Sequence, residues 1–446
     1  MEKLSGLGHL FMTIFLNHFS SFMVIPAITD VTMAAVCPGQ DECSLAIYLS
    51  GFQQAIIGVG TLVMMPLVGN LSDKYGRKAL LTVPLTFTII PLAILAYSRS
   101  RSFFYAYYVL KILTAMFCEG SVHCLALAYV ADNVSVERRA SAFGILSGIG
   151  SSAFVCGTLS TRFLSTASTF QVSVAVAIVA AVYMRVFLRD SIVEDDISAP
   201  LMSEKKGEVH DACSDRKSPK KDLEVFKTMP SLEDTICLLK TSVTFSQAAM
   251  VMFFSNLADV GLHASLMYYL KARFHFNKDQ FADLMVISGI AGTISQLLVM
   301  PMLAPSLGEE RLLSIGLFFN CVHMLLYGIG WSSWVSYAAA MFSIFFVFSQ
   351  PCIRSIVSKQ VGPCDQGKAQ GCISGIGSFA NVVSPLVFSP LTALFLSERA
   401  PFNFPGFSLM CSGFVSMVAF IQSMMIRAAP PISNHNKSNT CNYVDA

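Results

Sequence analysis

Long apolar segments recur along most of the chain and constrain its fold more than any other feature. Each is about 20 residues long, the length that an α-helix needs to cross the hydrocarbon core of a bilayer. The first group lies near residues 7–29, 47–69, 79–97, 103–131, 141–163 and 166–189, and the second near 242–270, 280–303, 311–330, 334–358, 369–397 and 406–428. The pattern predicts an all-α membrane protein with twelve transmembrane helices in two six-helix bundles.

The composition independently excludes a water-soluble protein. Hydrophobic residues make up 54% of the 446 residues and charged residues only 13%, with a mean hydropathy of +0.60. So little charge cannot cover a soluble surface. The net charge of +2 gives no reason to expect a nucleic-acid partner. The chain also has no phosphate-binding Gly-x-x-x-x-Gly-Lys-(Ser/Thr) loop, so we expect no ATP-driven activity.

Charge divides the chain into four regions. The bundles are predicted at 1–189 and 241–428, and the charged stretches at 190–240 and 429–446 are predicted to be a cytoplasmic linker and a cytoplasmic tail. Most Lys and Arg then lie on the inner side, which places both termini in the cytoplasm. No retention or lipidation signal is present, and both the plasma membrane and an endomembrane or vacuolar membrane stay open.

Cysteines indicate at most one covalent link. Cys37 and Cys43 lie in a predicted outer loop and are close enough in sequence to form a disulfide or to stay free. The other cysteines lack metal-ligand spacing, so we expect no metal site and no cofactor.

The two halves repeat one another. Val130–Gly150 aligns without gaps on Val357–Gly377, and both stretches end in Ser-Gly-Ile-Gly. A fainter repeat sets Leu71, Gly76, Leu80 and Leu81 against Leu303, Gly308, Leu312 and Leu313, with Pro305 at the place of Asp73. Two similar bundles can rock about a central site, as alternating access requires. The expected fold is therefore pseudo-symmetric.

A short polar turn, Gly69–Lys78, joins the second and third apolar segments. Gly69 and Gly76 permit the backbone angles of a helix end, and Asp73 can face a helix N-terminus. Its cationic residues favour the cytoplasmic side. A purely topogenic basic loop is the alternative interpretation.

The same turn resembles the loop between helices two and three of major facilitator superfamily transporters. The resemblance implies that Asp73 and Arg77 belong to a charge network that holds the inner gate shut. Ala128–Asp132 resembles the end of helix four in drug-efflux members and implies that Asp132 is the partner of Arg77. The implied gating network is Gly69, Asp73, Gly76, Arg77, Lys78 and Asp132.

The resemblance is incomplete elsewhere. The Arg of the helix-four motif is replaced by Leu113, and only Gly157 survives of the antiporter pattern in helix five. Over the whole chain, the sequence is similar to eukaryotic proteins of the hippocampus-abundant-transcript type and to bacterial tetracycline exporters. The residues that carry this similarity are Leu257–Gly261, Gln296 and Ser374–Ile376.

Polar side chains inside the apolar segments are candidates for a central cavity, because ionisable groups in the membrane normally face a partner or water. One stripe follows segment four and another follows segment seven: Lys111, Glu119 and His123, and Asn256, Asp259 and His263. In the superfamily both helices are expected to line the cavity. A carboxylate beside a histidine can carry a proton. The alternatives are a structural ion pair of Lys111 with Glu119 or Asp259, and contact with solute alone.

Several further polar residues carry less weight. Asn17, His18, Gln350 and Arg354 could contact a solute, but hydrogen bonding between helices is favoured for each. Arg354 lies near the predicted inner end, where its side chain could extend to the lipid headgroups.

The sequence therefore predicts a secondary transporter of a small organic solute, coupled to protons, that needs only a monomer in the bilayer. The alternative is a transporter-like receptor or scaffold that moves no solute. An enzyme is not expected, because the polar stripes hold no convincing catalytic set.

Overall fold

The computed structural model describes residues 2–36, 44–188, 242–276, 278–362, 365–396 and 400–426. These residues form helices joined by short turns, and twelve of the helical stretches are long and apolar enough to cross a membrane. The predicted all-α membrane fold is confirmed. Cys37, Cys43 and the whole of the predicted linker and tail lie outside the described residues, so the disulfide stays a prediction.

The first bundle contains eight α-helices and two short 3-10 turns. Their bounds are α1 Glu2–Val36, α2 Ser44–Tyr75, α3 Arg77–Phe87, α4 Ile89–Tyr97, α5 Arg101–Cys118, α6 Ser121–Asn133, η1 Val136–Arg138, α7 Arg139–Ser160, η2 Thr161–Phe163 and α8 Thr166–Phe187. Two predicted spans are each built from two helices, α3 with α4 and α5 with α6.

The second bundle has the corresponding order. Its elements are α10 Val243–Phe274, α11 Lys278–Ile294, the π-helical turn η3 Ser295–Val299, α12 Met300–Leu307, α13 Glu309–Ile329, α14 Ser333–Met341, the 3-10 turn η4 Phe342–Phe345, α15 Ser349–Lys359, α16 Gln366–Leu396 and α17 Phe407–Met424. Here α11, η3 and α12 share one span, and α14, η4 and α15 share another.

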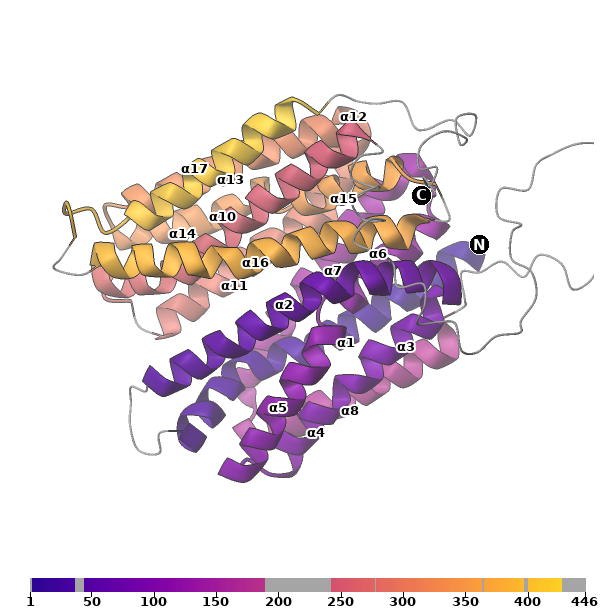
Figure 1. Cartoon of the computed structure of the whole chain (residues 1–446), viewed down its shortest axis with the longest axis horizontal. Helices are drawn as coiled ribbons and strands as arrows, with labels where there is room; N and C mark the ends of the chain where they lie inside the picture. Colours follow the sequence, from indigo (N-terminus) through magenta and orange to yellow (C-terminus); the bar gives the residue numbers. More distant parts are fainter. Residues whose placement is uncertain are drawn as a thin grey trace, which may run out of the picture.

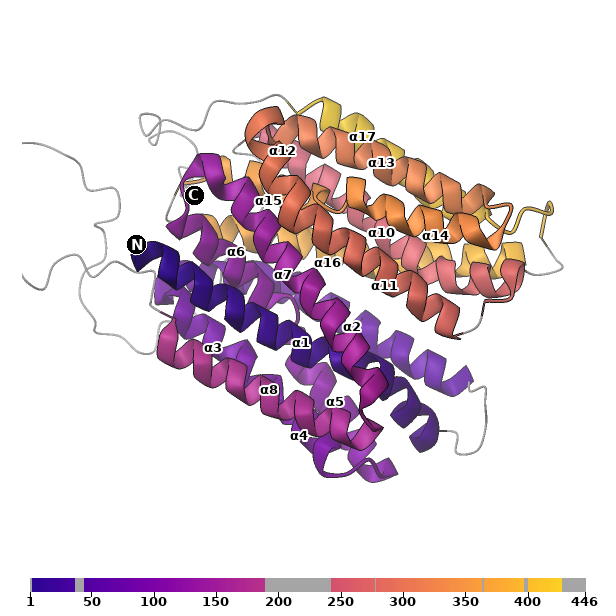
Figure 2. The same cartoon turned by 180° about the vertical axis from the view of Figure 1, so that it is seen from behind.

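The bundles lie side by side with their long axes in the same general direction (Figure 1). We call the end at which α2 meets α3 the proximal end, and the opposite end the distal end. Helix α2 packs along α16, and on the other side α7 packs along α11 and α12 (Figure 2). These two seams join the halves.

Glycine allows the seam between α2 and α16 to close tightly at the proximal end. A Cβ at Gly69 would overlap the backbone carbonyl of Gly367 and approach the Cα of Gly371. Small residues at such positions let helix backbones meet in a membrane protein.

The sequence repeat is visible in the backbone. Gly76 precedes α3 with φ 90° and ψ 150°, and Gly308 precedes α13 with φ 80° and ψ 154°. Positive φ at this ψ is costly for any residue with a Cβ. The two turns therefore keep the same glycine-dependent geometry, although the residues around them differ.

Candidate functional site

At the proximal end, Asp73 in the last turn of α2 reaches across to the second bundle. Its Oδ1 and Oδ2 accept hydrogen bonds from the backbone N–H groups of Gly367, at 3.0 Å, and Lys368, at 2.8 Å. These groups belong to the first turn of α16, where backbone N–H groups have no partner in their own helix. A carboxylate there also interacts favourably with the helix dipole. Asp73 therefore caps a helix of the other half.

Arg77 holds this carboxylate in place. Its Nη2 lies 2.5 Å from Asp73 Oδ1 and its Nε lies 2.8 Å from Asp132 Oδ2. Nη1 donates to the hydroxyl of Ser72. Arg77 is only 4% exposed, so the two carboxylates are needed to offset the cost of burying its charge. The structure thus brings together Asp73, Arg77 and Asp132, as the resemblance implied, whereas Lys78 takes part in none of the ion pairs found among the described residues.

A second contact between the halves lies beside the first. Arg139, at the start of α7, is buried, and its Nη1 donates to the backbone oxygen and to Oγ of Ser358, each at 3.1 Å. Ser358 is in the last turn of α15. No local pattern in the sequence predicts that Arg139 pairs with Ser358, because the two residues are 219 positions apart.

The second half contains the counterpart of the Arg77–Asp132 pair with its charges exchanged. Under the two repeat alignments, Glu309 takes the place of Arg77 and Lys359 the place of Asp132. Lys359 Nζ lies 2.5 Å from Glu309 Oε2, and the Glu309 side chain is 6% exposed. The repeat has lost the acid at Pro305 but has kept an ion pair at the same place.

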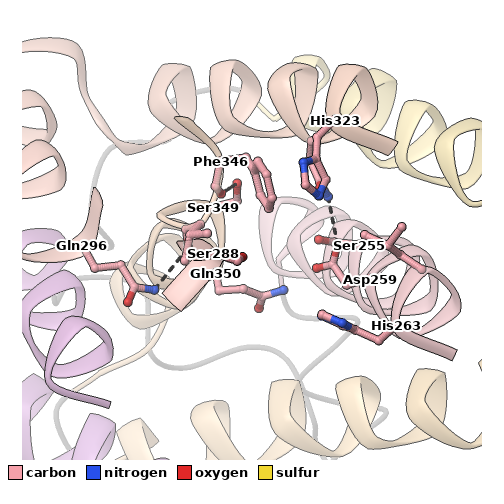
Figure 3. Close-up of a pocket in the computed structure, with 12 residues that line it drawn as sticks. Ser255, Asp259, His263, Ser288, Gln296, His323, Phe346, Ser349 and Gln350 are labelled. Carbon is pink, nitrogen blue, oxygen red and sulfur yellow. Dashed lines mark hydrogen bonds between the residues drawn. The ribbon is translucent and has the colours of Figure 1, made fainter. Parts of the chain in front are cut away.

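A cavity of about 230 Å³ lies within the second bundle (Figure 3). Asp259 and His263 of α10 contribute to its lining, with Asn320 and His323 of α13 and Gln350 of α15. Asn320 Nδ2 donates to Asp259 Oδ1 at 2.9 Å, and Gln350 Nε2 donates to Asn256 Oδ1 at 3.0 Å. Asp259 forms no ion pair within the part of the chain that the structure describes. A membrane-embedded acid without a cation, facing a cavity, is a candidate for proton binding.

The stripe predicted on segment four does not reach this cavity. Lys111, Glu119 and His123 are all absent from its lining, and neither Lys111 nor Glu119 belongs to an ion pair of the described residues. The expected meeting of the two stripes in one cavity is therefore not seen, because Asp259 and His263 face into their own bundle.

Segment four is also not the continuous helix that the sequence predicted. Helix α5 ends at Cys118 and α6 begins at Ser121, with Glu119 extended and Gly120 in the left-handed region at φ 80°. Glu119 lies in the break and is exposed, so Glu119 and His123 do not stand one helical turn apart on one face. His123 instead lies near His18 of α1, with ring centroids 6.4 Å apart.

Sequence reasoning did not single out Asn320 and His323. They stand three residues apart in the largely apolar part of α13 that follows its charged first turn, and both are buried. His323 Nδ1 lies 2.7 Å from the carbonyl oxygen of Ala339, which fixes the ring at the cavity wall. This polar pair at helical spacing was the signal available in the sequence.

Comparison with known proteins supports the same architecture. The family model described as Major Facilitator Superfamily matches residues 10–258 and 249–440. The human hippocampus abundant transcript 1 protein is 24% identical over 394 residues, covering 87% of this chain and 74% of that protein. The tetracycline resistance protein, class C, of Escherichia coli is 22% identical over 355 residues, covering 79% of this chain and 81% of that protein.

A solved structure has the same fold at low sequence identity. The crystal structure of the human organic anion transporter MFSD10 (TETRAN) superimposes with a TM-score of 0.75 at 18% identity, covering 95% of this chain and all of that one. At this identity the likeness concerns the fold alone.

Proposed function

Because this chain belongs to the major facilitator superfamily, we propose that it transports a small organic solute by alternating access, coupled to protons. Membership of this family of membrane transporters and the fold support transport. The observation that carries the mechanism is the capping of α16 by Asp73 across the two halves. A closure that rests on a few polar contacts can open and reform as the bundles rock.

In the proposed gate, Asp73, Arg77 and Asp132 act as one unit. Arg77 is buried between two carboxylates, and one of these carboxylates also binds the first turn of α16. Separating the halves removes the backbone partners of Asp73 but leaves the ion pairs inside the first bundle. The gate can therefore open without leaving Arg77 unpaired. Gly69 and Gly76 supply the close approach and the turn that bring these groups together.

The proposed proton site is Asp259, in the cavity of the second bundle. Its carboxylate is hydrogen-bonded to Asn320, and His263 and His323 line the same cavity. Protonation would remove a charge that pairs with no cation of the described residues, and it would change the hydrogen bonds between α10 and α13. Such a local change can bias the equilibrium between the two states of the transporter.

Solute uptake by the purified full chain in sealed vesicles, under an imposed proton gradient, tests both parts. We expect at least one solute of a chemically broad panel to accumulate, and Asp259→Asn to abolish the response to the gradient. Glu137→Gln is the control, because Glu137 is an exposed acid in η1 and takes part in none of the ion pairs found among the described residues. Glu119→Gln tests Glu119, the other acid for which the sequence predicts proton binding.

The outcomes separate the alternatives. If solutes bind to the protein but none crosses the membrane, the chain is a receptor or scaffold with a transporter fold. If uptake in Asp259→Asn and Glu119→Gln responds to the gradient as in the wild type, transport stands and the proton coupling proposed here is wrong.

A further inference from the structure

Three nitrogen-bearing side chains from three helices gather where the two bundles meet. They are His18 of α1, His123 of α6 and Arg354 of α15. The rings of His18 and His123 lie 6.4 Å apart at their centroids. Arg354 lies close enough to His123 and to Cys124 to interact with them electrostatically. Arg354 therefore faces the first bundle and does not extend to the headgroups, as its position in the sequence had suggested.

Among the described residues, Arg354 has no opposite charge within ion-pair distance. Its Nη1 donates to Ser374 Oγ at 3.1 Å and has a longer contact of 3.4 Å with Gln370 Oε1. Both partners are neutral. In the described ranges, the ion pairs use Arg77, Arg162 and Lys359, and none uses Arg354. A guanidinium inside the membrane without a carboxylate is expensive, so its retention suggests a partner that arrives from outside the chain.

The geometry of Arg354 leaves room for such a partner. Ser374 and Gln370 both engage Nη1, and among the described residues no hydrogen bond involves Nε or Nη2. These two nitrogens form the edge of the guanidinium that binds carboxylate or phosphate oxygens in pairs. Gln370 Nε2 also donates to the backbone oxygen of Arg354 at 3.1 Å, which fixes the base of the side chain.

The cluster borders accessible space between the helices. From Ser121 to Ala131 every side chain of α6 is buried except His123, which is partly accessible. His18, Arg354 and Ser374 are partly accessible too. Because the neighbours of His123 on α6 are buried on all sides, the space it reaches lies inside the protein and not in lipid.

We propose that Arg354, with His18 and His123, binds the anionic group of the transported solute, so that the substrate class is a small organic carboxylate or phosphonate. This inference rests on the proposed transport function. Arg354 supplies the fixed charge and the paired donors, and the His123 imidazole supplies a further N–H donor. The Nδ1–H of His18 is already donated to the backbone oxygen of Ile14, at 3.0 Å, so His18 donates to the anion through Nε2 when its ring is protonated. The N-terminus of α6 has no side-chain cap, and its positive dipole end lies one turn or less from His123. Ser374 and Gln370 position the guanidinium.

The experiment measures thermal stabilisation of the purified full chain by pairs of probes that differ in charge. Benzoate, phenylphosphonate and a series of aliphatic carboxylates are compared with benzamide, aliphatic amides and benzylammonium. We expect the wild type to be stabilised by anions and not by their neutral or cationic counterparts. Arg354→Gln should weaken anion binding roughly tenfold to a hundredfold, the usual effect of losing charge-assisted hydrogen bonds. Arg354→Lys keeps the charge but loses the paired donors. Its affinity for anions should therefore lie between those of the wild type and Arg354→Gln.

Arg185→Gln is the control, because Arg185 is exposed in the last turn of α8. If anions and amides stabilise the wild type equally, or if Arg354→Gln binds anions as the wild type does, the anion site is refuted. Uptake assays on the same variants distinguish failure of the anion site from failure of the transport proposal. Equal uptake of a neutral solute by wild type and Arg354→Gln would refute the anion site alone. Arg354-dependent anion binding with no flux of any solute would refute transport alone.

Discussion

Asp73 carries out two tasks with one carboxylate. It neutralises Arg77 inside the first bundle and caps α16 in the second. The two tasks can be separated by substitution, because asparagine keeps an acceptor oxygen for the helix cap and loses the charge, while alanine loses both.

We predict that Asp73→Ala opens the proximal end more than Asp73→Asn does. Loss of a helix cap costs about 1 kcal/mol, and loss of one partner of a buried ion pair costs more. The native Cys124 of α6 is fully buried and lies against Ser374 of α16, across the seam between the halves, so it serves as the reporter. Mass spectrometry of maleimide labelling at Cys124 should show the fastest reaction in Asp73→Ala, an intermediate rate in Asp73→Asn and the slowest in the wild type.

Lys78→Gln is the matched control, since it removes a neighbouring charge that forms no ion pair with any described residue. We expect its Cys124 to react at the wild-type rate. A Cys124 that stays unreactive in Asp73→Ala would show that this contact does not hold the proximal end shut.

At the scale of residues, the sequence could predict contacts that a motif contains but not those between the halves. Asp73, Arg77 and Asp132 were named from the resemblance of two short stretches. The partner of Asp73 on α16 is 294 positions away and consists of backbone N–H groups, which leave no side-chain pattern. The cluster of His18, His123 and Arg354 is likewise created by packing alone.

At the scale of elements, the two internal ion pairs differ in their relation to helix dipoles. Glu309 is the first residue of α13 and Lys359 the last of α15, so both charges match the ends at which they lie. Arg77 is the first residue of α3 and Asp132 lies near the end of α6. Each of these two charges is therefore unfavourable with respect to the dipole of its own helix. Asp73 compensates for this by giving Arg77 a second carboxylate.

We therefore predict that exchanging Glu309 and Lys359 restores stability only in part. Glu309→Lys and Lys359→Glu should each lower the thermal stability of the purified protein, since a buried charge loses its partner at a cost of about 3–5 kcal/mol. The double variant regains the ion pair but places both charges against the dipoles, at about 0.3–1 kcal/mol each. Its melting temperature should lie between those of the single variants and the wild type. Full recovery would contradict the dipole argument.

The seam between α2 and α16 gives a second prediction at this scale. Gly69→Ala should lower the melting temperature and speed labelling of Cys124, because the new Cβ would overlap the Gly367 carbonyl. Gly8→Ala in α1 is the control, because a Cβ there meets no atom within 4 Å. Alanine is the better helix former by about 1 kcal/mol, so Gly8→Ala should be neutral or stabilising. Equal behaviour of the two variants would show that the seam tolerates the extra atom.

The twelve helical spans could be predicted from the sequence, but their interruptions could not. Apolar composition fixes which residues enter the membrane, whereas the break at Glu119 and Gly120 has no proline and falls within an apolar run. A glycine inside such a run is compatible with a continuous helix, and only packing against the neighbouring helices selects the left-handed turn. For this reason Glu119 and His123 do not share the helical face that the sequence predicts.

For the whole molecule, the two ends are held differently. The proximal end has buried contacts from Asp73 and Arg139 to the second bundle. At the distal end, Arg162 pairs with Asp283 at 3.1 Å, but both side chains are about half exposed, at 52% and 54%. Exposed ion pairs contribute only about 0–1 kcal/mol. The resting protein is therefore expected to favour a state that is closed at the proximal end.

Spin labels on the two bundles test this expectation and the rocking motion together. One pair of cysteines replaces Tyr75 and Ser306 near the proximal end, and another replaces Phe163 and Trp331 near the distal end, on a background without reactive native cysteines. All four side chains are exposed. In the wild-type background, the proximal distances should form one short, narrow distribution. Asp73→Ala should lengthen them and shorten the distal distances in the same sample, because rigid bundles that open at one end must approach at the other. A proximal change without a distal one would mean that the gate loosens locally and that the halves do not rock as units.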